Sequence, residues 1–276
     1  MRLVTLSERN ISSRMGAQSS KPPDRLETAE KTGVYARRAA GLITVPEKVW
    51  AIANLRTLDL SENKLQTENI KKLGLLSKLK TLSLDSNKLV ALPAELCTLN
   101  DLTSLSAAKN SLASLPDALG ALSKLKTLTL AHNALAALPE SMCAMASLAT
   151  LDVSSNKLQH LPAGFGHLAA LVSASFANNH LGALPDGLEG LKRIKDLDLR
   201  GNAPLVVHGS VPAPLLLSTP LHRLELDDQL LDIDGTISEA AAGGKEAREA
   251  YLVRRKARID KELHSKDRGG EIRFGQ

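Results

Sequence analysis

The chain of 276 residues is 43% hydrophobic but only 2% aromatic, so its core must be aliphatic, mostly Leu and Ala. Such a core indicates a repeat structure rather than an ordinary globule. The net charge of +5 lies at the ends: residues 1–50 carry nine Lys or Arg against five Asp or Glu, and residues 245–276 carry ten against six. This distribution does not in itself make a nucleic-acid-binding surface.

The sequence also lacks the cysteine clusters typical of secreted repeat proteins. Residues 1–14 contain no apolar run of signal-peptide length, and no stretch approaches the length of a transmembrane span. The sequence therefore predicts a cytoplasmic protein.

The first segment, residues 1–23, is predicted to be flexible and contains a second candidate start. Read from Met15, the stretch "RMGAQSSKPP" fits M-G-x-x-x-S, the pattern for N-myristoylation. Gly16 is then the lipidation site. Read from Met1, Gly16 is an internal glycine with no free amine. A gene model extended upstream and alternative initiation that gives two isoforms both fit this pattern.

Residues 24–54 are predicted to form an N-terminal cap. The stretch "DRLETAEKTG" is typical of a short helix that ends at Gly33. The following "TGVYARRAAGLITVPEKVWAIAN" matches the second half of the repeat described next. Its first half lacks the L-x-x-L-x-L strand pattern of the repeat.

Residues 55–231 follow one repeated pattern. Five consecutive 23-residue units at 79–193 read L-x-x-L-x-L-x-x-N-x-L-x-x-L-P-x-x-L-x-x-L, and the pattern resumes at Ile194 and Leu221. This segment is therefore predicted to consist of leucine-rich repeats. The L-x-L alternation predicts a strand, and the L-P step predicts a short helical turn. Stacked units predict an α/β solenoid, with a curved parallel sheet on the concave side, helical turns on the convex side and caps at both ends.

Two columns of the repeat carry structural constraints. In one, Cys97 and Cys143 alternate with Gly120 and Gly166, which predicts closely packed positions that accommodate only small residues. In the other, an asparagine amide can both donate and accept hydrogen bonds. It is expected to satisfy backbone groups of the turn and of the next repeat. This ladder comprises Asn63, Asn87, Asn110, Asn133, Asn156, Asn179 and Asn202.

The C-terminal region is less regular. The stretch "NAPLVVHGSVPAPLLLSTP" lengthens the unit at Ile194 to 27 residues and predicts an irregular loop before a strand at 221–226. Residues 232–276 are predicted to form a capping helix and a disordered tail. The basic residues of that helix favour a solvated cap, with contact to acidic lipid or RNA as the alternative.

The exposed positions of the strands supply the candidate binding face. In the middle repeats they are mostly Ser or Thr, and no serine has a histidine placed as its base, so no catalytic residue is predicted. The acidic cluster at the C-terminal end lacks EF-hand spacing, which favours a protein partner over a divalent cation. The candidate partner-binding residues are Asp59, Asp152, Asp196, Asp198, Arg200, Arg223, Glu225 and Asp227.

The M-G start, the segment "TAEKTGV" and the run of L-P repeats together resemble the intracellular L-P type of the leucine-rich-repeat family. The resemblance implies a protein without enzymatic activity that is lipid-anchored at Gly16. A single myristoyl chain binds membranes only marginally, so a second signal would be needed.

We therefore expect a monomeric, non-enzymatic interaction adaptor without a metal or cofactor, which binds an unidentified protein partner. Its expected location is cytoplasmic, and peripheral to a membrane if Gly16 is acylated. One alternative is a regulatory subunit of a phosphatase or small-GTPase pathway. The other is an RNA-associated repeat protein that uses its basic termini, although the sequence does not favour nucleic acid as the partner.

Overall fold

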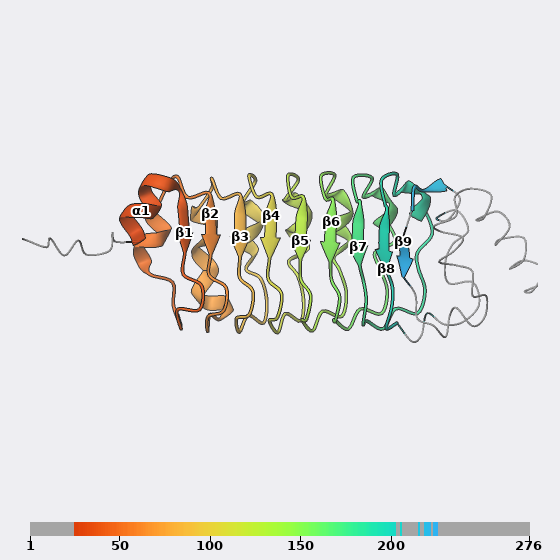
Figure 1. Cartoon of the computed structure of the whole chain (residues 1–276), viewed down its shortest axis with the longest axis horizontal. Coiled ribbons are helices and arrows are strands. Elements are labelled where there is room, and N and C mark those ends of the chain that lie inside the picture. Colours follow the sequence, from red (N-terminus) through yellow and green to blue (C-terminus); the bar gives the residue numbers. More distant parts are fainter. Residues whose placement is uncertain (1–24, 203–204, 206–214, 216–217, 222, 226–276) are drawn as a thin grey trace, which may run out of the picture.

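The computed structural model describes residues 25–202, 205, 215, 218–221 and 223–225. Within these residues, nine strands pair in parallel in chain order and form one continuous sheet (Figure 1). Equivalent residues of successive repeats pair with one another, as Thr81 does with Ser104. The strands are β1 (Val34–Ala36), β2 (Thr57–Asp59), β3 (Thr81–Ser83), β4 (Ser104–Ser106), β5 (Thr127–Thr129), β6 (Thr150–Asp152), β7 (Ser173–Ser175), β8 (Asp196–Asp198) and β9 (Arg223–Glu225).

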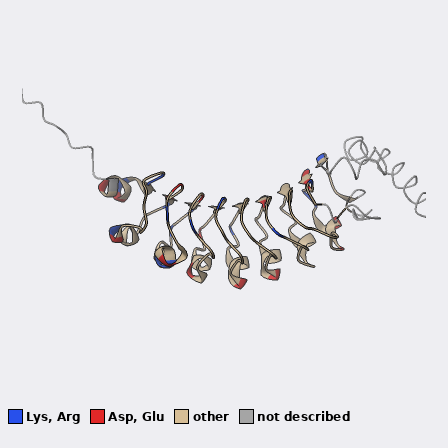
Figure 2. Ribbon diagram, turned by 90° about the horizontal axis from the view of Figure 1, so that it is seen from below, with Lys and Arg blue, Asp and Glu red and all other residues tan. Residues whose placement is uncertain are grey.

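Short 3₁₀ helices follow most of the strands. Figure 2 shows the strands along the inner side of an arc and these helices along its outer side, which confirms the predicted solenoid. Pro93, Pro116 and Pro139 each lie directly before a helix, with φ of −71°, −60° and −70°. The helices are η1 (Glu47–Ala51), η2 (Thr67–Leu75), η3 (Ala94–Thr98), η4 (Asp117–Ala121), η5 (Glu140–Ala144), η6 (Phe165–His167) and η7 (Leu188–Gly190).

The core between sheet and helices is a stack of aliphatic side chains. The middle residue of each strand points inward, and Leu82 and Leu128 are completely buried there. β7 has the smaller Ala174 at this position. Phe176, two residues further on, packs edge-to-face against Phe165 with 5.5 Å between the ring centroids. Each repeat therefore buries its apolar residues against its neighbours, as a solenoid requires.

The N-terminal region begins with α1 (Arg25–Thr32), which ends at Gly33 with φ of +72°, so the predicted helix and its end are confirmed. A Cβ at Gly33 would lie 2.8 Å from the carbonyl oxygen of Asn54. A strand follows the helix, because β1 pairs with β2 although its sequence lacks the strand pattern of the repeat. Tyr35 is buried at the inward position, but Arg37 takes the place of the second leucine, which hid the strand. The capping role stays a prediction.

The asparagine ladder joins each repeat to the one before it. The Nδ2 atom of Asn179 donates to the carbonyl oxygens of Phe176 (2.8 Å) and Ala177 (3.3 Å) in its own turn, and to that of Val153 (3.0 Å) in the preceding repeat. Its Oδ1 atom accepts from the backbone N–H of Leu158, also in the preceding repeat (3.0 Å). The predicted bonds within the turn are confirmed, whereas the predicted direction toward the next repeat is wrong. The first carbonyl group after a strand, such as that of Val153, has no hydrogen-bond partner in the sheet, and the asparagine of the following repeat donates to it.

Several predictions lie outside the described residues. These are the lipidation site Gly16, the binding residue Asp227, the flexible segment 1–23, and the C-terminal cap and tail at 232–276. For the predicted binding residue Glu225, the structure describes the backbone but not the side chain. None of the helices in the described ranges combines the length and the apolar character needed to cross a membrane.

Candidate protein-binding surface

The concave face of the middle repeats is a bed of small hydroxyl side chains. Within β3 to β7, the first and third residue of each strand point away from the core and are at least partly exposed. Nine of these ten residues are Ser or Thr, which confirms the smooth face that the repeat columns predicted. The exception is Asp152.

Two predicted binding residues on this face stabilise local turns. The Oδ1 atom of Asp59 accepts hydrogen bonds from the backbone N–H (2.9 Å) and the hydroxyl (2.6 Å) of Ser61. Asp152 makes the same pair of bonds with Ser154, at 3.0 and 2.7 Å. Asp59 lies six strands from β8 and Asp152 lies two, or about 29 and about 10 Å at the usual strand spacing. The structure therefore does not bring them together with the other predicted residues.

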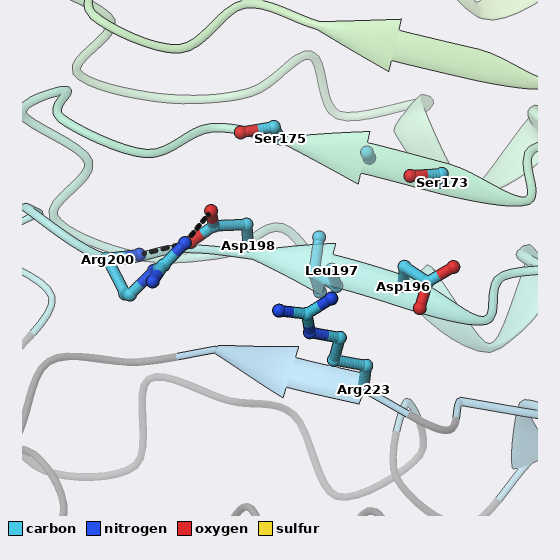
Figure 3. Close-up of a pocket in the computed structure, with 8 residues that line it drawn as sticks. Ser173, Ser175, Asp196, Leu197, Asp198, Arg200 and Arg223 are labelled. Atoms are coloured by element: carbon cyan, nitrogen blue, oxygen red, sulfur yellow. Dashed lines mark hydrogen bonds and ion pairs between the residues drawn. The ribbon is translucent and has the colours of Figure 1, made fainter.

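The remaining described residues gather around a hollow at the C-terminal end of the sheet. This C-terminal hollow has a volume of about 260 Å³ and is lined by residues of β7, β8 and β9 and the turn after β8. Figure 3 shows Arg223 reaching from β9 toward Leu197 on β8, with Asp196 on one side and Asp198 on the other. The lining residues are Ser173, Ala174, Ser175, Asp196, Leu197, Asp198, Arg200 and Arg223.

An ion pair fixes one wall of the C-terminal hollow. The guanidinium of Arg200 donates to both carboxylate oxygens of Asp198, at 2.9 and 2.7 Å, and its backbone N–H donates at 3.1 Å. Partial burial raises the pKa of Asp198. The hydrogen bonds from Arg200 and the positive charges of Arg200 and Arg223 lower it more strongly, so this pKa lies below its ordinary value. The Asp198 carboxylate therefore stays ionised and held in place near neutral pH.

Asp196 is the exposed carboxylate of the group. It begins β8 beside Ser173, and its side chain projects from the concave face (Figure 3). Among the described side chains, no group of three or more His, Cys, Asp or Glu is placed to hold a metal ion. The C-terminal hollow thus presents carboxylates and guanidinium groups beside a hydroxyl floor, a combination suited to hydrogen bonding with a polar segment of another protein.

Sequence reasoning found the four described charged residues of the hollow, but it also included Asp59 and Asp152, which lie elsewhere on the sheet, and it missed the floor of the hollow. Ser173 and Ser175 were predicted only as part of the uniform hydroxyl face. The signal was in the columns, because these serines occupy the same repeat positions as Asp196 and Asp198 and hence pair with them in register.

Family comparisons agree with this architecture. The family model for leucine rich repeats matches residues 77–135, 100–158 and 123–181, and a second leucine rich repeat model matches residues 54–76. The volume-regulated anion channel subunit LRRC8D of Rattus norvegicus is 37% identical over 76 residues, which are 27% of this chain and 9% of that protein.

Solved structures share the fold over about two thirds of the chain. A leucine-rich-repeat protein of Leptospira interrogans is 32% identical with a TM-score of 0.54, over 67% of this chain and 52% of that one. The ectodomain of the Arabidopsis thaliana receptor kinase GASSHO1/SCHENGEN3, in complex with CASPARIAN STRIP INTEGRITY FACTOR 2, is 32% identical with a TM-score of 0.59, over 67% and 23%. A TDR receptor is 30% identical with a TM-score of 0.56, over 66% and 36%. The chain thus spans about half of the Leptospira protein and less of the others.

Proposed function

Because the chain belongs to the leucine-rich repeat family, we propose that it is a non-enzymatic adaptor that binds a protein partner on its concave face. Leucine-rich repeat proteins are generally interaction modules without enzymatic activity. The Arabidopsis ectodomain that this chain resembles is itself in complex with another molecule.

The C-terminal hollow is the observation that carries this proposal. There, carboxylate and guanidinium side chains lie together beside the hydroxyl floor. The aromatic residues within the described ranges are Tyr35, Trp50, Phe165 and Phe176, and all four are buried. Because aromatic anchors usually supply the strongest contacts of an interface, we expect a polar interface of moderate affinity.

Charge reversal at Asp196 is predicted to prevent binding of the partner protein. Asp196→Lys places a third cation beside Arg200 and Arg223 without touching the core, whereas Asp186→Lys makes the same charge change at an exposed residue in the loop before η7. Proteins recovered from native cells by affinity enrichment should be depleted about tenfold or more with the first variant and unchanged with the second. Equal recovery by both variants and the unaltered chain would place binding elsewhere.

We also infer that Gly16 carries a myristoyl group when translation starts at Met15. Gly16 lies outside the described residues, so the support is the M-G-x-x-x-S pattern and the resemblance of residues 15–260 to leucine-rich-repeat-containing protein 57. The adaptor would then be a cytoplasmic protein that binds membranes reversibly through its acyl chain.

N-terminal peptide mapping of the protein from eukaryotic cells tests the lipid anchor. We expect a mature N-terminus at Gly16 that carries myristate. A mature N-terminus at Met1, with Gly16 unmodified inside the chain, would rule the anchor out.

A further inference from the structure

Positive charge is concentrated in the loops that lead into the strands. The four-residue segments before β2 to β8 contain eight Lys or Arg and a single acidic residue, Asp101. Elsewhere, residues 55–202 carry seven Lys or Arg against twelve Asp or Glu. These eight cations, here called the basic rim, are all exposed: Arg56, Lys78, Lys80, Lys124, Lys126, Lys192, Arg193 and Lys195.

Backbone hydrogen bonds place the basic rim along one edge of the solenoid. The N–H of Lys80 donates to the carbonyl of Arg56, that of Thr103 to Lys80, and that of Lys126 to Thr103, each at 2.8 Å. Neighbouring residues of this line are about 4.8 Å apart, so Lys80 and Lys126, which are two strands apart, are separated by about 10 Å. Three strand spacings, about 14 Å, separate Lys126 from Lys195. The line runs along the long edge of the sheet where the strands begin (Figure 1). The concave face remains open beside it.

The acidic residue within these loops does not neutralise the rim. Its partner is Lys124, whose Nζ atom lies 2.7 Å from a carboxylate oxygen of Asp101 while 62% of the lysine side chain stays exposed. The hydrogen bond and charge of Lys124, together with the charges of Lys78 and Lys80, hold the pKa of Asp101 below its ordinary value. Several lysines thus surround one carboxylate, and the rim keeps an excess of positive charge.

An apolar side chain stands beside these cations. Leu75 is the last residue of η2, directly before the loop that carries Lys78 and Lys80, and it is 63% exposed. Lysines are attracted to anionic headgroups, and an exposed leucine near them adds apolar contact with the bilayer interface. Nucleic acid would gain nothing from Leu75, and the buried aromatic residues of the described ranges offer no platform for base stacking.

We propose that the basic rim docks on an anionic phospholipid membrane, with Leu75 at the bilayer interface and the solenoid standing on its edge. The proposal goes beyond the adaptor function, because a partner can bind the concave face with or without a membrane. The C-terminal hollow opens on the concave face beside this edge, where Asp196 directly follows the rim residue Lys195. If Gly16 is acylated, the rim also supplies the second signal that a single acyl chain needs.

Vesicle co-sedimentation of the unacylated full chain tests the proposal separately from the lipid anchor. The rim variant replaces Lys78, Lys80, Lys124 and Lys126 by Gln. The control variant replaces Lys64, Lys88, Lys109 and Lys157 by Gln, which removes the same charge from exposed positions after the strands. Each protein is mixed with vesicles of phosphatidylcholine alone or with phosphatidylserine, at low and at high salt.

We expect the unaltered chain and the control variant to bind anionic vesicles, and the rim variant to bind them about tenfold more weakly or worse. High salt should release all of them, because it screens the rim. Matching thermal unfolding of the two variants shows that both fold. If both variants bind anionic vesicles equally well, the basic rim does not carry the membrane affinity and the proposal is overturned. Any remaining affinity would then come from another part of the chain, such as the basic termini. Tighter, rim-dependent binding to an RNA duplex or to polyglutamate than to vesicles would also overturn the proposal.

Discussion

Replacing Asn179 by aspartate is expected to reduce the free energy of unfolding by about 3–5 kcal/mol, the usual cost of a buried uncompensated charge. Asn179 is 2% exposed, and its Nδ2 atom faces three backbone carbonyl oxygens. Aspartate presents an oxygen to those three acceptors and cannot donate to them when ionised. Because the bonds span two repeats, the substitution loosens the stack as well as the turn.

Urea unfolding followed by circular dichroism measures this effect. Asn179→Ala should cost less than the aspartate variant, about 1–3 kcal/mol, because it leaves polar groups unpaired without adding a charge. Asn100→Asp is the matched control, since Asn100 is exposed in the loop before β4. If Asn179→Asp and Asn100→Asp unfold at the same urea concentration, the ladder does not hold the repeats together.

A methyl group at Gly120 is expected to destabilise the convex side by about 2–3 kcal/mol. A Cβ built on Gly120 in η4 would lie 2.0 Å from the backbone carbonyl oxygen of Ser141 in η5. Because the obstacle is backbone, no change of rotamer relieves it, and the two repeats must move apart. The midpoint of urea unfolding should therefore fall for Gly120→Ala.

Gly182→Ala is the control for this prediction. A Cβ at Gly182 meets nothing within 4 Å. Its φ is not in the left-handed region, so alanine should leave stability unchanged or raise it by about 0.4–1 kcal/mol. Equal midpoints for the two alanine variants would mean that the helices are not in close contact at Gly120.

The regular part of the fold was predictable because each repeat carries the same physical signals. The L-x-L alternation gave the strands, and the proline of the L-P step gave the start of most convex helices. The column shared by Cys97, Gly120, Cys143 and Gly166 was predicted to be tight. The contact expected at Gly120 confirms this, and Gly164 leaves room beside the side chain of Cys143.

The structure differs from the sequence predictions where backbone hydrogen bonding, rather than the pattern of side chains, determines the local structure. β1 forms although Arg37 stands where a leucine would mark the strand, because backbone N–H and C=O groups pair with β2 regardless of that side chain. Each asparagine bonds to the preceding repeat because the first carbonyl group after each strand needs a donor. Neither the pairing of β1 nor the direction of these bonds can be recognised from the sequence pattern.

The candidate site was predictable only as a set of charges. Asp196, Asp198, Arg200 and Arg223 come together because parallel pairing puts equivalent repeat positions side by side. The bidentate ion pair between Asp198 and Arg200 forms because an arginine takes the place that Ser61 and Ser154 have in the equivalent turns of other repeats. Asp59 and Asp152 occupy the same repeat position as Asp198, and all three accept a hydrogen bond from the backbone N–H two residues further on. They differ in the side chain at that later position, which is a serine hydroxyl beside Asp59 and Asp152 but a guanidinium beside Asp198.

The dissociation constant of a recovered partner tests the role of the C-terminal hollow most directly. Isothermal titration would compare the unaltered full chain with the Asp196→Lys and Asp186→Lys variants. We expect Asp196→Lys to bind at least about tenfold more weakly, which is about 1.4 kcal/mol, and Asp186→Lys to bind like the unaltered chain. Equal affinity for all three proteins would contradict a partner site in the C-terminal hollow.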